Sequence, residues 1–232
     1  MSRTAGRPAL FTFKEFPLRA LLACAAVLVA GAGLAEDLPS LIVPVKVALK
    51  AEKWDAAVEA GEKAVKELPD SSEAYLWLGR AYGQKAMKAS FLFQMGLAKK
   101  CRISFEKAVA LDPSSADARV DLIQYYANAP GIVGGGIDKA RVEIKALDGL
   151  DAARGALMNG YVLAKEKKPV EAEAEYRRAV SLKPGDAAIR VRFGHFLERA
   201  GRKDEAKDSY REALRLDPAL EGAKKDLERL GG

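Results

Sequence analysis

The chain has 232 residues, of which 49% are hydrophobic and 30% charged, so wholesale disorder is excluded and the length suits one domain or two small ones. Aromatic residues make up only 7%, whereas Ala, Leu, Glu, Lys and Arg are abundant, which favours helices. With one His and two Cys, the sequence lacks the side chains for an ordinary His/Cys metal site or for a nucleophile paired with a histidine base. We expect no enzymatic activity, no metal and no cofactor.

The first 35 residues differ in kind from the rest. Residues 1–19 carry four basic side chains and one acid, and an uncharged run, ALLACAAVLVAGAGLA, follows at residues 20–35. A basic start, a short apolar core and the small residues of Gly33-Leu34-Ala35 are typical of a secretory signal peptide. The run is shorter than the roughly 20 residues of a spanning helix. We therefore expect a cleaved leader and a periplasmic protein, with an inner-membrane anchor at residues 20–35 as the alternative.

Cleavage would change both the charge and the cysteine count. The leader holds four of the 38 basic and one of the 32 acidic side chains, so the net charge would fall from +6 to +3. Nucleic-acid binding needs a clustered basic face, and a basic leader does not supply one, so no nucleic-acid partner is expected. Cys24 would also leave, and Cys101 alone cannot form an intramolecular disulfide.

Four segments align without gaps, and each ends a predicted helix with a proline turn. Their prolines are separated by 44, 71 and 34 residues. The last gap is one unit of about 34 residues and the middle gap is two, so a degenerate repeat must lie in residues 117–152. The aligned segments are EKAVKELPDS (62–71), EKAVALDPSS (106–115), RRAVSLKPGD (177–186) and REALRLDPAL (211–220).

The pattern resembles the tetratricopeptide repeat family. In the last repeat, signature positions of that family are occupied by Gly194, Ala206, Tyr210, Ala213 and Pro218. The resemblance implies an all-α fold, a right-handed α-solenoid of about five helix-turn-helix units, within a domain at residues 36–232. The expected units are residues 41–71, 72–115, 116–152, 153–186 and 187–218, followed by a capping helix at 219–230.

Small residues are expected to let the two helices of a unit pack closely, with aromatic side chains filling the gap to the next unit. Gly79, Gly160 and Gly194 would face alanines of the second helix, and Cys101 would occupy a buried small-residue position. The first repeat departs from the pattern, because Pro44 interrupts its first helix.

The resemblance also implies that a protein or peptide binds in the concave groove lined by the first helix of each unit. Of the groove residues, Arg80, Arg154, Lys165 and Arg199 are suited to binding carboxylates, and a solvated charged face is the alternative. The groove positions given by the repeat phase are Glu73, Leu76, Arg80, Gln84, Asp117, Val120, Gln124, Asn128, Arg154, Leu157, Tyr161, Lys165, Val191, His195, Glu198 and Arg199.

A glycine-rich stretch, PGIVGGGIDKA, lies between the two helices of the third repeat. It lacks the Gly-Lys-Ser/Thr ending of a Walker loop, and its Gly spacing is the reverse of the dinucleotide fingerprint. Turn chemistry explains it, since Pro130 bars continuation of the preceding helix and glycines permit a tight return. An anion or nucleotide bound by Gly131–Gly136 is the alternative.

The second repeat carries about ten extra residues at the equivalent turn, in GQKAMKASFLFQMGLAKKCR (83–102). Ser90 is expected to cap an early second helix. Neighbouring turns lie side by side in a solenoid, so Phe91, Phe93 and Met95 are expected to approach Ile132 and Val133 as a small satellite core. The alternative is an exposed apolar edge patch for a partner or a membrane surface.

These features together predict a non-enzymatic scaffold or adaptor of the cell envelope that binds a protein or peptide segment. The rival functions are an anion- or nucleotide-binding protein and a membrane-anchored assembly factor. Membrane attachment is expected only if the leader is retained, and the sequence does not indicate an oligomeric state.

Overall fold

The structure, a computed structural model, describes residues 37–231, so the predicted leader and its cleavage position lie outside the described residues. The chain divides into two units, residues 1–40 and 41–232. In the first unit, the described residues 37–40 form the start of a helix. The account below concerns the second unit.

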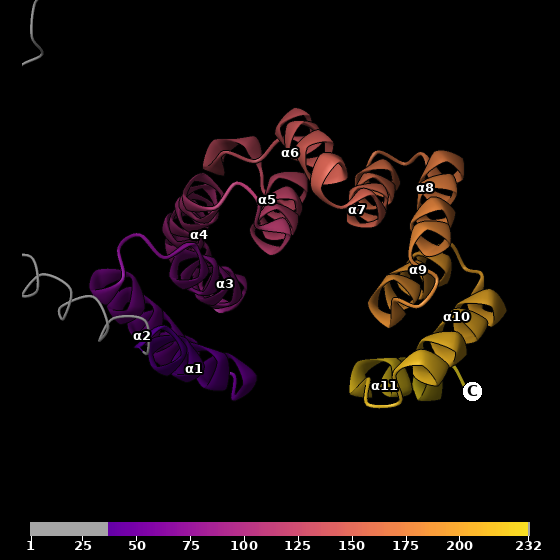
Figure 1. Ribbon diagram of the computed structural model, residues 1–232, viewed down its shortest axis with the longest axis horizontal. Helices are drawn as coiled ribbons and strands as arrows, with labels where there is room; N and C mark the ends of the chain where they lie inside the picture. Colours follow the sequence, from indigo (N-terminus) through magenta and orange to yellow (C-terminus); the bar gives the residue numbers. More distant parts are fainter. Residues whose placement is uncertain (1–36, 232) are drawn as a thin grey trace, which may run out of the picture. The chain divides into compact units, whose positions relative to one another are not determined.

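Residues 37–231 form eleven α-helices and one 3-10 helix, with no strand (Figure 1). Within residues 72–216 the α-helices pack as four consecutive pairs, which confirms the predicted all-α solenoid of repeat units. None of the helices in the described part of the chain is both long and apolar enough to cross a bilayer. The elements are α1 (Asp37–Lys50), α2 (Trp54–Glu67), α3 (Ser72–Lys88), α4 (Phe91–Leu111), α5 (Ala116–Asn128), η1 (Gly131–Val133), α6 (Ile137–Leu150), α7 (Ala152–Lys165), α8 (Pro169–Leu182), α9 (Ala187–Arg199), α10 (Lys203–Leu216) and α11 (Glu221–Arg229).

The first helix of four units begins in the same way. The side chains of Ser71, Ser115, Asp151 and Asp186 each accept a hydrogen bond from the backbone amide three residues later. Such an N-cap satisfies an amide that has no partner within the helix, and its loss typically costs about 1 kcal/mol. The caps therefore fix where α3, α5, α7 and α9 start, and with them the position of every side chain on those helices.

Two packing expectations were wrong. Helix α1 continues through Pro44, so this proline does not end the first helix. The second error concerns the glycines of the first helices. A Cβ added at Gly79 would lie 2.5 Å from the ring of Phe105, and one added at Gly194 would lie 2.5 Å from the ring of Tyr210. These two glycines thus accommodate the aromatic ring of the second helix of the same unit, whereas Gly160 also lies against the expected alanine, Ala172.

One hydrophobic core extends through the second unit, from Val45 on α1 to Tyr210 on α10. Cys101 lies within it and is 3% exposed, which confirms its predicted burial. Burial, aided by the charge of Asp121, raises the pKa of the Cys101 thiol to about 12.

Candidate functional site

Polar pairs join the first helices of neighbouring units. Arg80 on α3 donates to Asp121 on α5 at 2.5 Å, and Arg154 on α7 donates to Asp117 on α5. Both arginines were predicted to bind the carboxylates of a partner. Each already pairs with a carboxylate of the protein, so a carboxylate of a partner would have to compete with that pairing.

The same kind of link recurs between later helices of the chain. The Asn128 side chain on α5 and the Tyr161 hydroxyl on α7 exchange hydrogen bonds of 2.6 and 2.9 Å. His195 on α9 lies 2.7 Å from Asp226 on α11. Arg229 on α11 donates two hydrogen bonds to Glu198, at 2.5 and 2.9 Å. Two pairs of predicted groove residues thus engage each other, Asp117 with Arg154 and Asn128 with Tyr161, whereas Arg80, His195 and Glu198 pair with residues outside the predicted set.

The step from α7 to α9 is the exception. Among the described residues, no hydrogen bond or ion pair joins these two helices, although they are in contact. Lys165 on α7 and Arg192 and Arg199 on α9 are exposed, and none forms an ion pair within residues 37–231. Sequence reasoning missed Arg192, although its spacing of three and seven residues from His195 and Arg199 places all three on one helix face.

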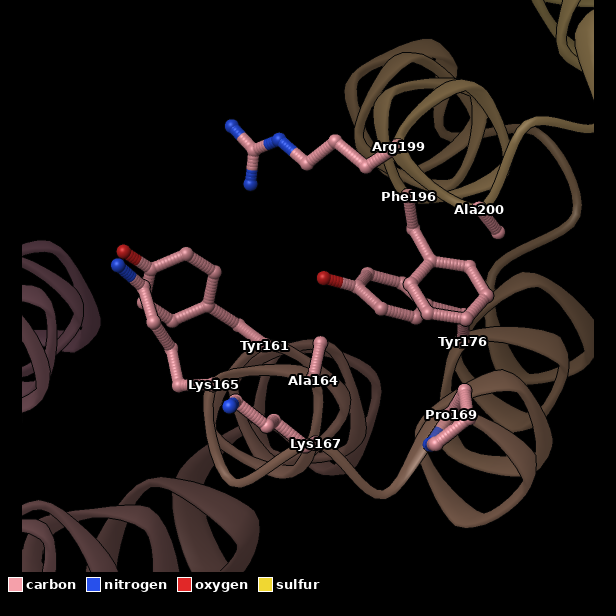
Figure 2. Close-up of a pocket in the computed structure, with 9 residues that line it drawn as sticks. All are labelled: Tyr161, Ala164, Lys165, Lys167, Pro169, Tyr176, Phe196, Arg199 and Ala200. Carbon is pink, nitrogen blue, oxygen red and sulfur yellow. The ribbon is translucent and has the colours of Figure 1, made fainter.

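A pocket of about 580 Å³ opens between α7, α8 and α9 (Figure 2). Its apolar wall is aromatic: the rings of Tyr176 and Phe196 stack with centroids 4.8 Å apart at 27°, and Tyr161 faces them. Its cationic residues are Lys165, Lys167 and Arg199. The arrangement suits a ligand with an apolar group next to a negative charge.

The Tyr176 hydroxyl points into this pocket (Figure 2). It makes no hydrogen bond to any described residue, although the side chain is only 5% exposed. Burial raises the pKa of Tyr176 to about 12, against the opposing charges of Arg199 and Arg192. The phenol is therefore a neutral donor at physiological pH, ready for a carboxylate or a carbonyl oxygen.

Several predicted groove residues do not present a free side chain. Leu76 and Leu157 are each 5% exposed and belong to the core, so they offer little surface to a partner, although Leu157 lines a smaller pocket together with Tyr161. Glu73 accepts from Lys46 and from the Trp77 indole. The other predicted groove residues differ in exposure: Gln84 is exposed, whereas Val120, Gln124 and Val191 are partly buried.

The backbone amides of the glycine-rich loop donate hydrogen bonds to carbonyl oxygens of the protein itself. Gly134 donates to Gly131, Gly135 to Pro130 and Gly136 to the carbonyl of Tyr126 at 2.9 Å. Gly134 has φ +90°, and a Cβ at Gly135 would lie 1.8 Å from the Ala129 carbonyl oxygen. A phosphate site would need these amides free. The loop therefore serves the turn, and the geometry gives no support to an anion site at Gly134–Gly136.

The predicted satellite core is wrong. Phe91, Phe93 and Ile132 are 77%, 67% and 75% exposed, so they do not bury one another. Val133 alone is buried, and its carbonyl accepts a hydrogen bond from Tyr125. Met95 is 36% exposed. The side chain that packs on the glycine loop is Arg102, which lies against Gly134 and pairs with Glu106.

Comparison with known proteins identifies repeats of one family in the chain. Family models described as tetratricopeptide repeat match residues 45–90, 85–115 and 163–225. No curated protein matches the sequence. A thermophilic tetratricopeptide repeat protein of Thermus thermophilus is 22% identical, with a TM-score of 0.62 over 83% of this chain and 98% of that one. PilF of Pseudomonas aeruginosa is 15% identical, with a TM-score of 0.56 over 86% of this chain and 90% of that one.

The two structures share the fold with this chain, and the matched repeats define its family. Repeats of this kind form protein-interaction scaffolds, and the function of this chain is of that general class. The chain belongs to the tetratricopeptide repeat family.

Proposed function

We propose that this protein is a non-enzymatic scaffold of the cell envelope that binds an acidic, extended segment of a partner protein at the step from α7 to α9. The observation that carries the proposal is the contrast along the groove. Most steps between first helices pair their charges internally, whereas at the α7–α9 step Lys165, Arg192 and Arg199 form no ion pair among the described residues, and only Arg192 is influenced by an acid, Asp121.

The chemistry of the pocket supports the same ligand. Aromatic walls accept an apolar side chain, the cations pair with carboxylates, and the Tyr176 phenol donates to a carbonyl or carboxylate oxygen. Hydrogen bonds to charged groups contribute about 1.5–3 kcal/mol each, so two or three of them suffice for selective recognition.

Site-specific photo-crosslinking in cells tests the location of binding. A photoreactive residue at Ala164, which lines the pocket, should cross-link a partner, whereas the same residue at the exposed Val142 on α6 should not. The double variant K165E/R199E should abolish the cross-link from position 164. Equal cross-linking from both positions, or an undiminished cross-link in the double variant, would contradict the proposed site.

The envelope location rests on the leader pattern of residues 1–35. Mass spectrometry of the chain isolated from cell fractions tests it. We expect a periplasmic product that begins at Glu36. A product that retains residues 20–35 in the membrane fraction would instead support the anchored form, and the groove would then act from the membrane surface.

A further inference from the structure

The tip of the α3–α4 hairpin exposes an unusual run of apolar side chains. Phe91, Leu92 and Phe93 are consecutive and are 77%, 78% and 67% exposed, and Met87 at the end of α3 is 64% exposed. A soluble surface rarely shows three adjacent large apolar side chains without a function for them. We name Met87, Phe91, Leu92 and Phe93 the tip patch.

The hairpin that carries the tip patch is longer than its neighbours. Helix α4 has 21 residues, compared with 14 in α6, α8 and α10. Seven extra residues correspond to about 10 Å of helix. Only Ala89 and Ser90 connect α3 to α4, so the tip patch lies around a tight turn and the first turn of a helix. A tip of this shape suits insertion into a surface, because it offers no cleft for a peptide.

Along the sequence, the charged residues on both sides of the tip patch are all basic. No acidic residue occurs between Glu73 and Glu106, and this stretch contains Arg80, Lys85, Lys88, Lys99, Lys100 and Arg102. Four of the six pair with acids from elsewhere in the chain or from the following turn, namely Asp121, Asp55, Glu62 and Glu106. Lys88 and Lys99 are exposed and form no ion pair within residues 37–231.

Apolar and aromatic side chains next to unpaired lysines are complementary to the interface of an anionic bilayer. The aromatic and aliphatic groups enter the boundary between headgroups and acyl chains, while lysines remain at the level of the lipid phosphates. Each lysine near an anionic surface strengthens binding about fivefold. We infer that the tip patch docks the protein peripherally on an anionic lipid surface, independently of the peptide groove between α7 and α9.

An environment-sensitive fluorophore on the full chain tests this inference. The label is placed at Leu92→Cys in a Cys24→Ser background, where the remaining cysteine, Cys101, is buried. Vesicles of equal parts phosphatidylcholine and phosphatidylglycerol should shift the emission to the blue, and quenchers carried on the lipid chains should reduce it. Vesicles of phosphatidylcholine alone should give a much smaller change. Because the label reports on position 92, binding through residues 20–35 does not by itself produce the signal.

Two pairs of variants with matched controls separate the apolar and the charged contributions. K88Q/K99Q should weaken binding to the anionic vesicles about 25-fold, whereas K203Q/K225Q, which removes two other exposed and unpaired lysines, should leave it unchanged. In vesicle co-flotation, F91S/F93S should lose binding that V142S/V170S retains, since Val142 and Val170 are equally exposed elsewhere.

An emission that does not respond to anionic vesicles overturns the inference. An emission shift of equal size in K88Q/K99Q also overturns it. So does an emission shift that depends on protein concentration in the absence of lipid, because that result would mean that the tip patch binds a second copy of the chain. Failure of these experiments leaves the groove proposal untouched, because no tip-patch residue lines the pocket between α7 and α9.

Discussion

Arg80 on α3 donates to Asp121 on α5 at 2.5 Å, and both side chains are largely shielded from solvent. Burial raises the pKa of Asp121 despite the opposing charge of Arg80. A partner carboxylate would have to displace Asp121 from the arginine and would leave a buried acid unpaired, which is unfavourable. Arg199, by contrast, has no such competitor. This difference between two arginines on first helices of the repeat units is the basis of the proposed site.

The close contact between Gly194 and Tyr210 predicts a stability effect. Gly194→Ala would place a Cβ 2.5 Å from the ring of Tyr210, which is fully buried and cannot move aside. We expect a loss of about 1–3 kcal/mol in the free energy of unfolding, measured by chemical denaturation. Gly149→Ala is the control, because a Cβ there meets no atom within 4 Å and alanine favours the helix. A destabilisation equal to that of the control would contradict the packing.

The link between Glu198 and Arg229 predicts a pH dependence. Hydrogen bonds from Arg229, together with one from Tyr210, lower the pKa of Glu198 from its ordinary value of 4.5 to about 2. A lowered carboxyl pKa contributes stability above pH 4.5, and that contribution is lost as the pH falls toward 2. We expect E198Q to be less stable than the wild type by about 1 kcal/mol near neutral pH, because the pair is partly exposed.

Denaturation at a series of pH values checks this expectation. The difference in unfolding free energy between wild type and E198Q should shrink steadily below pH 4.5. E59Q, which alters an exposed glutamate without an ion pair among the described residues, should follow the wild type throughout. A difference for E198Q that stays constant with pH would show that the carboxylate charge is not involved.

The burial of Cys101 predicts slow thiol chemistry. The side chain is 3% exposed and its pKa is raised to about 12, so the reactive thiolate is scarce in the folded protein. In a Cys24→Ser background, a maleimide should react with Cys101 only when denaturant is added. The same background with Leu92→Cys, which is 78% exposed in the wild type, should react at once. Similar rates at both positions without denaturant would show that α4 does not pack as described.

The internal hydrogen bonds of the glycine loop predict protection from exchange. The amides of Gly134, Gly135 and Gly136 all donate within the turn, so they should exchange hydrogen slowly. Gly135→Ala should remove that protection, because its Cβ would lie 1.8 Å from the Ala129 carbonyl oxygen. Gly131→Ala, where a Cβ meets nothing within 4 Å, should preserve it. Fast exchange in the wild type would show that these amides are free, and the loop would then again be a candidate anion site.

The repeat pattern was sufficient to predict the fold class, because the spacing of small residues and prolines fixes where helices form and which faces are buried. It did not predict which groove cations are free. Arg80 finds its acid 41 residues away, and that pairing depends on the geometry between units. Phe91 and Phe93 were assigned to a satellite core because two insertions are adjacent in the repeat order. The structure shows that insertions in neighbouring repeats need not bring their side chains into contact.

The central claim is that acidic segments bind where the groove cations lack internal partners. The partner segment that cross-links to position 164 can be made as a fluorescent synthetic peptide, together with a copy in which its acidic residues are replaced by the corresponding amides. Measuring the binding of both peptides by fluorescence anisotropy tests the claim most directly. The wild type should prefer the acidic peptide about tenfold or more, since hydrogen bonds to charged groups contribute about 1.5–3 kcal/mol each. K165Q/R199Q should lose that preference while K63Q/K203Q keeps it. An unchanged preference in K165Q/R199Q would contradict the account.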